Sequence, residues 1–436
     1  NFRAGVNAGN SIESGGNYNV VVGDEAGTAI TTGDGNVLLG YGAGDAVTTA
    51  TNNIAIGYLA LSTEDAHGSN VAIGRQALEN QNAGAEAYNV AIGSLAGNDI
   101  TTGVSNTIIG GLAGDAITTG GSNTAVGYSS GGAVTTGSFN TLLGTVAGDA
   151  LTTANSNVAV GYSALSTDTL GAKNVAVGVS ALLTQNFTTA TNSYNIGVGH
   201  NAGKLITTGV NNTLIGGLAG DAITDADWNV SLGYRSLSSN TVGSKSVAIG
   251  SYALDVQNPA TATDMFNTAV GHYAGQAVTT GTGNTLIGGL AGDALTTSNN
   301  NVAIGYQALT TDTLGTKTVA IGVDALKSQN QTTNTDTYNV ALGYYAGRDV
   351  TTGIQNTLIG GLAGDALTDA DANVAIGVGA LGADTLGNRS VAIGMNALEA
   401  QNFTTATNTY NIAVGFEAGK AVTTGVNNTL IGGLAG

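Results

Sequence analysis

The sequence contains no cysteine and only one proline among 436 residues, and charged residues make up 9% of it. The absence of cysteine excludes a disulfide framework, a thiolate metal site and a thiol nucleophile. A net charge of −18 argues against a surface that binds nucleic acid, because phosphates attract basic side chains. No run of about 18 consecutive apolar residues occurs, so no membrane insertion is expected in this segment.

Glycine is abundant, with 69 residues, and many of these glycines recur at a fixed spacing. A phrase made of Asn, three mostly aliphatic or small residues and Gly occurs 25 times, with Ser or Thr replacing the Asn in three copies. Most closing glycines are 17 residues apart. From Gly127 onward, the spacings 17, 17, 17 and 21 form a 72-residue super-repeat that occurs four times. We therefore expect residues 1–436 to be a single continuous repeat array, and a fragment of a longer chain because it begins without Met.

A 17-residue period is too short for a pair of helices and fits one coil of a parallel β-solenoid. The sequence predicts an all-β solenoid of about 24 coils, each with two short strands. The second strand is expected in the Thr-Thr-Gly and Thr-Asp-Thr-Leu-Gly segments. Because strand side chains alternate, the β-branched first residue and the aliphatic third residue of each phrase are expected to fill the interior. The middle residue, usually Ala, is expected to face outward against a cover such as another subunit.

The ends of each phrase are expected to have structural roles. Stacked Asn side chains can form a hydrogen-bonded ladder, and Gly suits a positive φ or a close approach of the backbone. We expect these roles for the Asn and Gly of three representative phrases: Asn212 with Gly216, Asn301 with Gly305, and Asn373 with Gly377.

The phrase Asn-Val-Ala-Ile-Gly, followed by small residues and a glycine-bearing turn, resembles the head repeats of trimeric autotransporter adhesins of the YadA type. Longer phrases such as Asn-Val-Ala-Ile-Gly-Tyr-Gln-Ala-Leu at 301–309 are also similar to repeats of bacterial and phage proteins of the tail-fibre type. The resemblance covers the whole chain and implies a β-roll, a side-by-side homotrimer and a role in surface attachment. The period departs from the family, whose coils have about 14 residues.

The 21-residue coils carry a four-residue insertion, where binding residues are expected because loops on a rigid scaffold often carry function. The candidate binding residues are aromatic: Phe187, Tyr194, Phe266, Tyr338, Phe403 and Tyr410. Together with Asn and Thr they would suit a glycan or a protein receptor. The alternative is that Phe187 and Tyr194 close a small core over the lengthened turn.

Other polar residues recur with the 72-residue period. The cations Lys173, Lys245, Lys317 and Arg389 are expected to face solvent and pair with Asp or Glu. The phrase around Asp221, repeated at Asp293 and Asp365, is similar to a calcium-binding nonapeptide, although its third Gly is one residue late. A local turn is the preferred interpretation, so no cofactor is predicted and calcium is the alternative. No metal site is expected at His67, His200 or His272.

No paired carboxylates, catalytic triad or phosphate loop is evident, so we expect no enzyme. The favoured function is an extracellular fibrous surface protein that presents adhesive loops to cells or surfaces. The alternatives are a phage tail or capsid fibre that recognises a host and an ice-binding solenoid. Only one residue of each Thr-Thr pair could join an ice-binding row, because adjacent strand residues face opposite ways. The expected location is a bacterial cell surface or a virion appendage.

Overall fold

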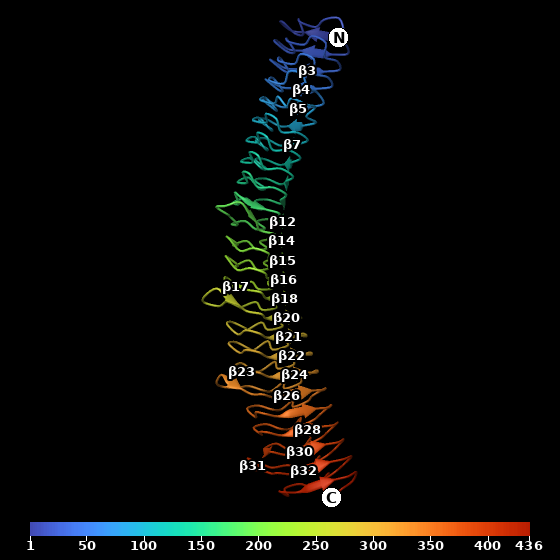
Figure 1. Ribbon diagram of the computed structural model, residues 1–436, viewed down its shortest axis with the longest axis vertical. Helices are drawn as coiled ribbons and strands as arrows, with labels where there is room; N and C mark the ends of the chain where they lie inside the picture. The colour runs from blue at the N-terminus through green and yellow to red at the C-terminus, as the bar shows by residue number, and fades with distance from the viewer. The chain divides into compact units, whose positions relative to one another are not determined.

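The computed structural model describes residues 1–436 as two compact units, Asn1–Gly217 and Leu218–Gly436. Each unit is all-β, contains no helix and consists of stacked coils (Figure 1). Within each unit, every coil contributes one three-residue strand, which pairs in parallel and in register with its counterpart in the next coil, as Val302 pairs with Val319. The two units together contain 25 such strands at a spacing of about 17 residues, which confirms the predicted all-β parallel solenoid.

The long strands of the first unit are β1 (Phe2–Ala4), β2 (Val20–Val22), β3 (Val37–Leu39), β4 (Ile54–Ile56), β5 (Val71–Ile73), β6 (Val90–Ile92), β7 (Thr107–Ile109), β8 (Thr124–Val126), β9 (Thr141–Leu143), β10 (Val158–Val160), β12 (Val175–Val177), β14 (Ile196–Val198) and β15 (Thr213–Ile215). Those of the second unit are β16 (Val230–Leu232), β18 (Val247–Ile249), β20 (Thr268–Val270), β21 (Thr285–Ile287), β22 (Val302–Ile304), β24 (Val319–Ile321), β26 (Val340–Leu342), β27 (Thr357–Ile359), β28 (Val374–Ile376), β30 (Val391–Ile393), β32 (Ile412–Val414) and β33 (Thr429–Ile431).

A second, two-residue strand forms only beside the inserted segments. The pairs are β11 (Gly171–Ala172) with β13 (Thr191–Asn192), β17 (Gly243–Ser244) with β19 (Thr263–Asp264), β23 (Gly315–Thr316) with β25 (Thr335–Asp336), and β29 (Gly387–Asn388) with β31 (Thr407–Asn408). The prediction of two strands in every coil was therefore wrong. The Thr-Thr-Gly segments are bends that still bond from coil to coil, as when the Thr31 N–H donates to the Thr48 carbonyl.

The middle residue of each long strand points into the coil, which reverses the predicted orientation. In β22, Ala303 is fully buried, whereas Val302 and Ile304 are only partly buried. The same pattern of a buried middle residue between partly exposed neighbours recurs in β28 and β30. The interior is so narrow that it takes one residue per strand. The outward side of the long strands is therefore formed by the β-branched and aliphatic residues, which we call the outer face.

In many coils a Leu on one side of the interior faces an Ala or Gly on the other. Other coils, such as that of Ala269 and Gly275, have two small residues, and Leu side chains of the neighbouring coils fill the space there. Where the middle residue is Ala303, the residue four positions after the closing glycine is the buried Leu309. Where the middle residue is Leu286, that later position is Gly292, and a Cβ there would lie 2.7 Å from the Leu286 Cδ2 atom. Close packing of this kind leaves no room for two large side chains in one coil.

The Asn residues form a buried ladder that links successive coils. The backbone N–H of Asn301 donates to the side-chain oxygen of Asn284 at 3.0 Å, and the Asn301 amide donates to the Gly315 carbonyl at 2.9 Å. Asn373 makes the equivalent bonds at 3.0 and 2.9 Å, and the Asn212 N–H donates to Asn195 at 2.9 Å. Each ladder bond satisfies polar groups that burial would otherwise make costly.

The closing glycines combine a positive φ with a close approach between coils. Gly305 has a φ of +137°, and a Cβ there would lie 2.3 Å from the carbonyl oxygen of Gly322. Gly216 and Gly377 have φ values of +133° and +132°. A side chain at Gly305 or Gly377 would meet backbone atoms that cannot move without separating the coils.

Candidate functional site

Four inserted segments, each paired with the preceding coil, project from the regular stack, and we call them shelves 1 to 4. Their two-stranded sheets are β11–β13, β17–β19, β23–β25 and β29–β31 in that order. In the second unit, β17, β23 and β31 lie on the side of the coils away from the long strands (Figure 1). The four extra residues carry the chain outward, and the short parallel pair holds them against the previous coil.

The six aromatic residues predicted to bind separate into two groups on the shelves. Tyr194, Phe266, Tyr338 and Tyr410 are 48–60% exposed. Phe187 and Phe403 are only 5% and 7% exposed, so they pack under their shelves and offer no contact surface. The predicted small core over the lengthened turn therefore describes Phe187, whereas Tyr194 lies outside it.

Each exposed shelf aromatic lies beside a cation from the previous coil. The four pairs are Lys173–Tyr194, Lys245–Phe266, Lys317–Tyr338 and Arg389–Tyr410, with 5.1–5.7 Å between the charged group and the ring centroid. This range allows a cation–π attraction. The sequence interpretation anticipated the solvent-facing cations but not their aromatic partners.

The predicted acidic partners of these cations are present on only two shelves. Lys245 and Lys317 form ion pairs of 2.5 Å with Asp264 and Asp336. On shelf 1 the Lys173 ammonium donates to the Tyr194 hydroxyl at 3.0 Å, where the residue equivalent to Asp264 is Asn192. On shelf 4 Arg389 donates to the Tyr410 hydroxyl at 2.7 Å.

A buried carboxylate with a glutamine lies under shelf 1, and we call this arrangement a polar corner. Asp168 is fully buried and accepts hydrogen bonds from the Gln185 amide at 2.6 Å and from the N–H groups of Gly171 and Phe187. Burial raises the pKa of Asp168 above its ordinary value, and the bond from Gln185 opposes this rise. The Gln185 oxygen in turn accepts from the ladder residue Asn195.

Polar corners also occur under the other shelves, with the amide of Asn240 in place of the carboxylate on shelf 2, and they were not anticipated from the sequence. The residues that correspond to Asp168 are Asn240, Asp312 and Asp384, which follow it at intervals of 72. In coils that have Gly instead of Leu four residues after the closing glycine, the residue that corresponds to Asp312 is aliphatic, as at Leu295. This two-by-two alternation of aliphatic and polar residues was a signal in the sequence that could have revealed the corners.

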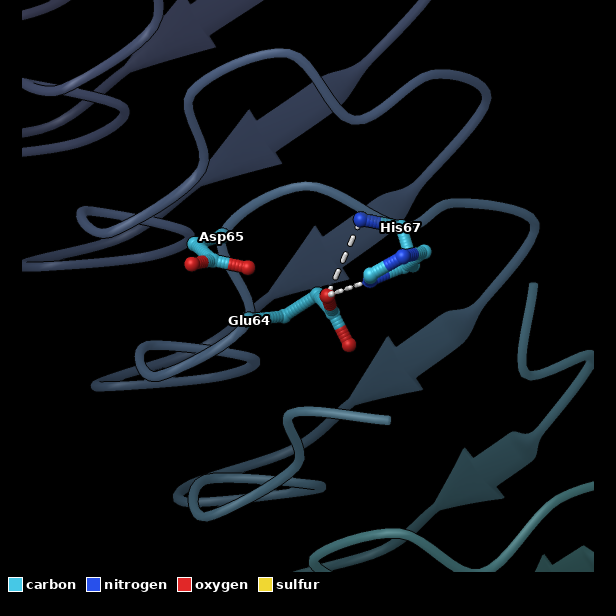
Figure 2. A group of neighbouring side chains, drawn as sticks. All are labelled: Glu64, Asp65 and His67. Atoms are coloured by element: carbon cyan, nitrogen blue, oxygen red, sulfur yellow. Dashed lines mark hydrogen bonds and ion pairs between the residues drawn. The ribbon is translucent and has the colours of Figure 1, made fainter. Parts of the chain in front are cut away.

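The first unit contains a related group at Glu64, Asp65 and His67, whose possible ligand atoms lie within 4.8 Å of one another (Figure 2). Glu64 is buried and accepts from the His67 N–H at 3.0 Å, as Asp168 accepts from Gly171. Its other oxygen accepts from the Gln81 amide at 3.3 Å. These contacts identify the group as another polar corner. The sequence interpretation considered His67 without these two neighbouring acids.

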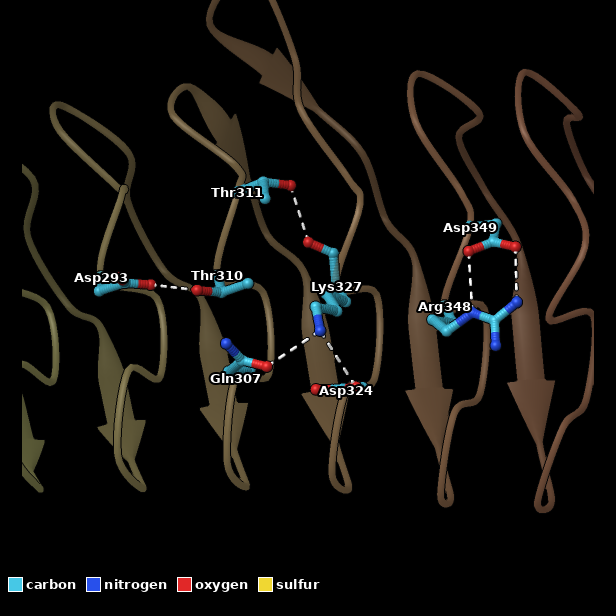
Figure 3. Close-up of polar contacts among 8 residues, drawn as sticks. All are labelled: Asp293, Gln307, Thr310, Thr311, Asp324, Lys327, Arg348 and Asp349. Carbon is cyan, nitrogen blue, oxygen red and sulfur yellow. Dashed lines mark hydrogen bonds and ion pairs between the residues drawn. The ribbon is translucent and has the colours of Figure 1, made fainter.

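The turn after each long strand gathers many of the charged side chains, which pair within one coil or with the coil before (Figure 3). Lys327 donates to Gln307 at 2.9 Å and to Asp324 at 3.2 Å. Arg348 makes two hydrogen bonds to Asp349, and this contact lowers the pKa of the Asp349 carboxyl. Lys327 and Arg348 therefore have partners within the chain itself.

The three aspartates of the calcium-like phrase lie on coils that are separated by 72 residues. The hydroxyl of Ser238 donates to Asp221 at 2.6 Å, and that of Thr310 donates to Asp293 (Figure 3). Burial raises the pKa of both Asp293 and Asp365. The hydroxyl contacts of Asp221 and Asp293 come from the next coil and not from their own turn, and calcium at this phrase stays a prediction.

Two hollows lie near the shelves. One of about 260 Å³ lies beside shelf 1, between the turn at 153–155 and the strands β11 and β13. A shallower one of about 390 Å³ is lined by Trp228, Lys245 and Val247.

A comparison with family models finds no match for the chain, and a comparison with curated proteins finds none either. The structure contains no helix with the length and hydropathy needed to cross a membrane.

Proposed function

We propose that the chain is a non-enzymatic, extracellular fibrous surface protein whose shelves attach it to cells or surfaces. The observation that carries this proposal is that the four-residue insertions of the 72-residue repeat form the shelves, and that each shelf exposes an aromatic ring: Tyr194, Phe266, Tyr338 and Tyr410. A rigid scaffold that presents exposed aromatic side chains on loops is typical of a binding surface.

The non-enzymatic part of this proposal is supported by how the acidic residues are used. Asp168, Asp312 and Asp384 are fully buried and bond to glutamine and backbone N–H groups of the shelf. Asp264 and Asp336 neutralise lysines on the surface. Each of these carboxylates therefore has a structural role that links its coil to a neighbouring coil.

The proposed assembly is a homotrimer that forms through the outer faces. In each unit this face carries a row of Val, Thr, Ile and Leu side chains that is free of charge in the regular coils, and several are more than a third exposed, such as Leu232 and Leu342. A contiguous apolar surface of this kind is typical of an interaction site. Sedimentation equilibrium should give three times the chain mass of 42.7 kDa, and a monomer at all concentrations would refute the trimer.

Attachment can be tested by replacing the four exposed shelf aromatics with alanine in one variant. Adhesion of the purified chain to a panel of host-cell and abiotic surfaces should fall at least tenfold, because exposed aromatics supply much of the contact energy. A matched control replaces four exposed tyrosines away from the shelves: Tyr41, Tyr58, Tyr128 and Tyr162. Equal adhesion of the shelf variant and the wild type would refute the proposal.

A further inference from the structure

The hollow beside shelf 1 is a step produced by the insertion. β13 pairs with β11 and extends past the coil above it, so the turn at 153–155 forms one wall and the strand pair forms the other. The lining of the hollow includes Thr153, Asn155, Leu170, Ala172, Thr191 and Asn192. The volume of about 260 Å³ is large enough for one saccharide ring but small for a drug-sized ligand.

The lining combines an apolar base with uncharged hydrogen-bonding groups. Leu170 and Ala172 are half-buried, while Thr153, Asn155 and Asn192 are exposed. The Asn155 side-chain oxygen accepts from the Ser138 N–H at 2.7 Å, which fixes its orientation and leaves its NH₂ group as a donor. Amides and hydroxyls that both donate and accept suit the vicinal hydroxyls of a sugar, and an apolar base suits its ring carbons.

The electrostatic surroundings distinguish this step from its three counterparts. The positions of Thr153, Asn155 and Asn192 carry Asp225, Asp227 and Asp264 on shelf 2; Thr297, Asn299 and Asp336 on shelf 3; and Asp369, Asp371 and Asn408 on shelf 4. Shelf 1 alone has no carboxylate at any of them. Lys173, the residue after Ala172, bonds only to the Tyr194 hydroxyl, so its charge has no acidic partner.

We propose that the step beside shelf 1 binds a single saccharide residue of a surface glycan, and that the other three steps do not. This inference rests on the proposed role of the shelves in attachment and names the ligand class for one of them. Asn155, Asn192 and Thr153 supply hydrogen bonds, and the Tyr194 ring and the Lys173 ammonium lie next to the step.

The test uses the full chain and a panel of purified oligosaccharides that contain neutral hexose, N-acetylhexosamine or uronic acid residues. The decisive variant is Asn155→Asp with Asn192→Asp. Both changes occur naturally at equivalent positions of this chain, and Asp371 keeps the backbone bond that Asn155 makes, so the fold is retained. Binding to at least one oligosaccharide should fall about tenfold or more, which corresponds to roughly 1.4 kcal/mol.

The matched control is Asn408→Asp on shelf 4, which should leave binding unchanged because that step already carries Asp369 and Asp371. A loss of binding with Lys173→Met only for uronic acid probes would place the acid group of the sugar at the ammonium. Failure of every oligosaccharide to bind, or equal losses in the shelf 1 and shelf 4 variants, would overturn the inference. If adhesion to cells persists in that case, the proposed function survives; if adhesion is absent while a sugar binds at shelf 1, the proposed function fails and this inference stands.

Discussion

Two neighbouring coils of the second unit close the same corner in opposite ways. In the coil with the closing glycine Gly288, the corner is filled by the buried aliphatic side chain of Leu295. In the next coil, with the closing glycine Gly305, the corner is filled by Asp312, which is equally buried. The Asp312 carboxylate accepts from the Gly315 N–H at 2.9 Å, the Gln331 N–H at 3.1 Å and the Gln329 amide at 2.6 Å.

The difference shows what allows the chain to leave the regular coil. At the aliphatic corner the backbone satisfies itself, since the Thr296 N–H donates to the Thr313 carbonyl of the next coil. Beside a shelf, the N–H groups of Gly315 and Gln331 have no such carbonyl and use the Asp312 side chain. The buried carboxylate thus replaces main-chain acceptors where the path of the chain departs from the period.

The largest effect on stability is expected from Asp312→Ala at the polar corner. The change removes the acceptor of three buried hydrogen bonds and leaves the N–H groups of Gly315 and Gln331 without one, and we expect it to lower the free energy of unfolding by roughly 3–5 kcal/mol. Chemical denaturation, with hydrogen exchange of the residues in shelf 3, measures the loss and its location.

The matched control is Asp312→Asn, because Asn240 occupies the same corner of shelf 2 and accepts from the Gly243 N–H at 3.0 Å. We expect this variant to lose about 1 kcal/mol or less. Equal losses in both variants would mean that the corner depends on the charge and not on its hydrogen bonds.

The aliphatic coil can be tested by exchanging its residues for those of its neighbour. Leu286→Ala should cost roughly 2–4 kcal/mol, because the opposing residue is Gly292 and no side chain can fill the cavity. Adding Gly292→Leu recreates the Ala303 and Leu309 arrangement of the next coil, in which Leu309 tolerates a φ of +57°. The double variant should regain at least half of the loss.

Gly292→Leu alone is the control for this exchange and should also destabilise the protein, since its Cβ would lie 2.7 Å from the Leu286 Cδ2 atom. Additive losses in the double variant, measured by thermal or chemical unfolding, would disprove the compensation between the two positions.

A smaller effect is expected from the titration of Asp168. Burial raises the pKa of Asp168 above its ordinary value of 3.8, so the folded state holds the proton more tightly than the unfolded chain. The stabilisation that results is complete below the unfolded pKa and is lost as the pH rises through the folded pKa.

As the pH rises above about 4, the denaturation midpoint of the wild type should therefore fall more than that of Asp168→Asn. Asn240→Asp provides the converse change on shelf 2 and should increase the dependence on pH. Identical pH profiles for wild type and Asp168→Asn would show that this carboxyl does not titrate in that range.

The smallest effect is expected at the surface. Lys317→Met removes the ion pair with Asp336, and both side chains are more than 40% exposed. Exposed ion pairs contribute little because water and salt screen them, so no measurable shift of the unfolding midpoint is expected. A clear loss of stability would mean that the stacking of Lys317 on Tyr338 matters more than its exposure suggests.

The architecture could be predicted from the spacing of the glycines, because a close approach such as that of Gly305 to Gly322 tolerates no other residue. The direction in which the strand side chains point could not be predicted from the sequence. β-branched residues such as Val302 suit either face of a strand, and Ala303 alone does not indicate how narrow the interior is.

The candidate site was predicted only in part. The insertions and the exposed ring of Tyr194 could be found from the period and composition, but the burial of Phe187 depends on how the shelf folds back. The hydrogen bond between Asp168 and Gln185 joins residues 17 apart, so it becomes visible only once the coils are aligned. The hollow beside shelf 1 arises from the step between two coils and has no signal of its own in the sequence.

The Asn ladder has a consequence for how such a gene could change in length. Asn301 takes its N–H acceptor from Asn284 in the coil before and offers its own oxygen to Thr318 in the coil after. Since each coil meets only its immediate neighbours, a block of 72 residues begins and ends on surfaces that already match. Unequal recombination between blocks could add or delete one without any compensating substitution, so the number of shelves could vary among descendants while every remaining contact is kept.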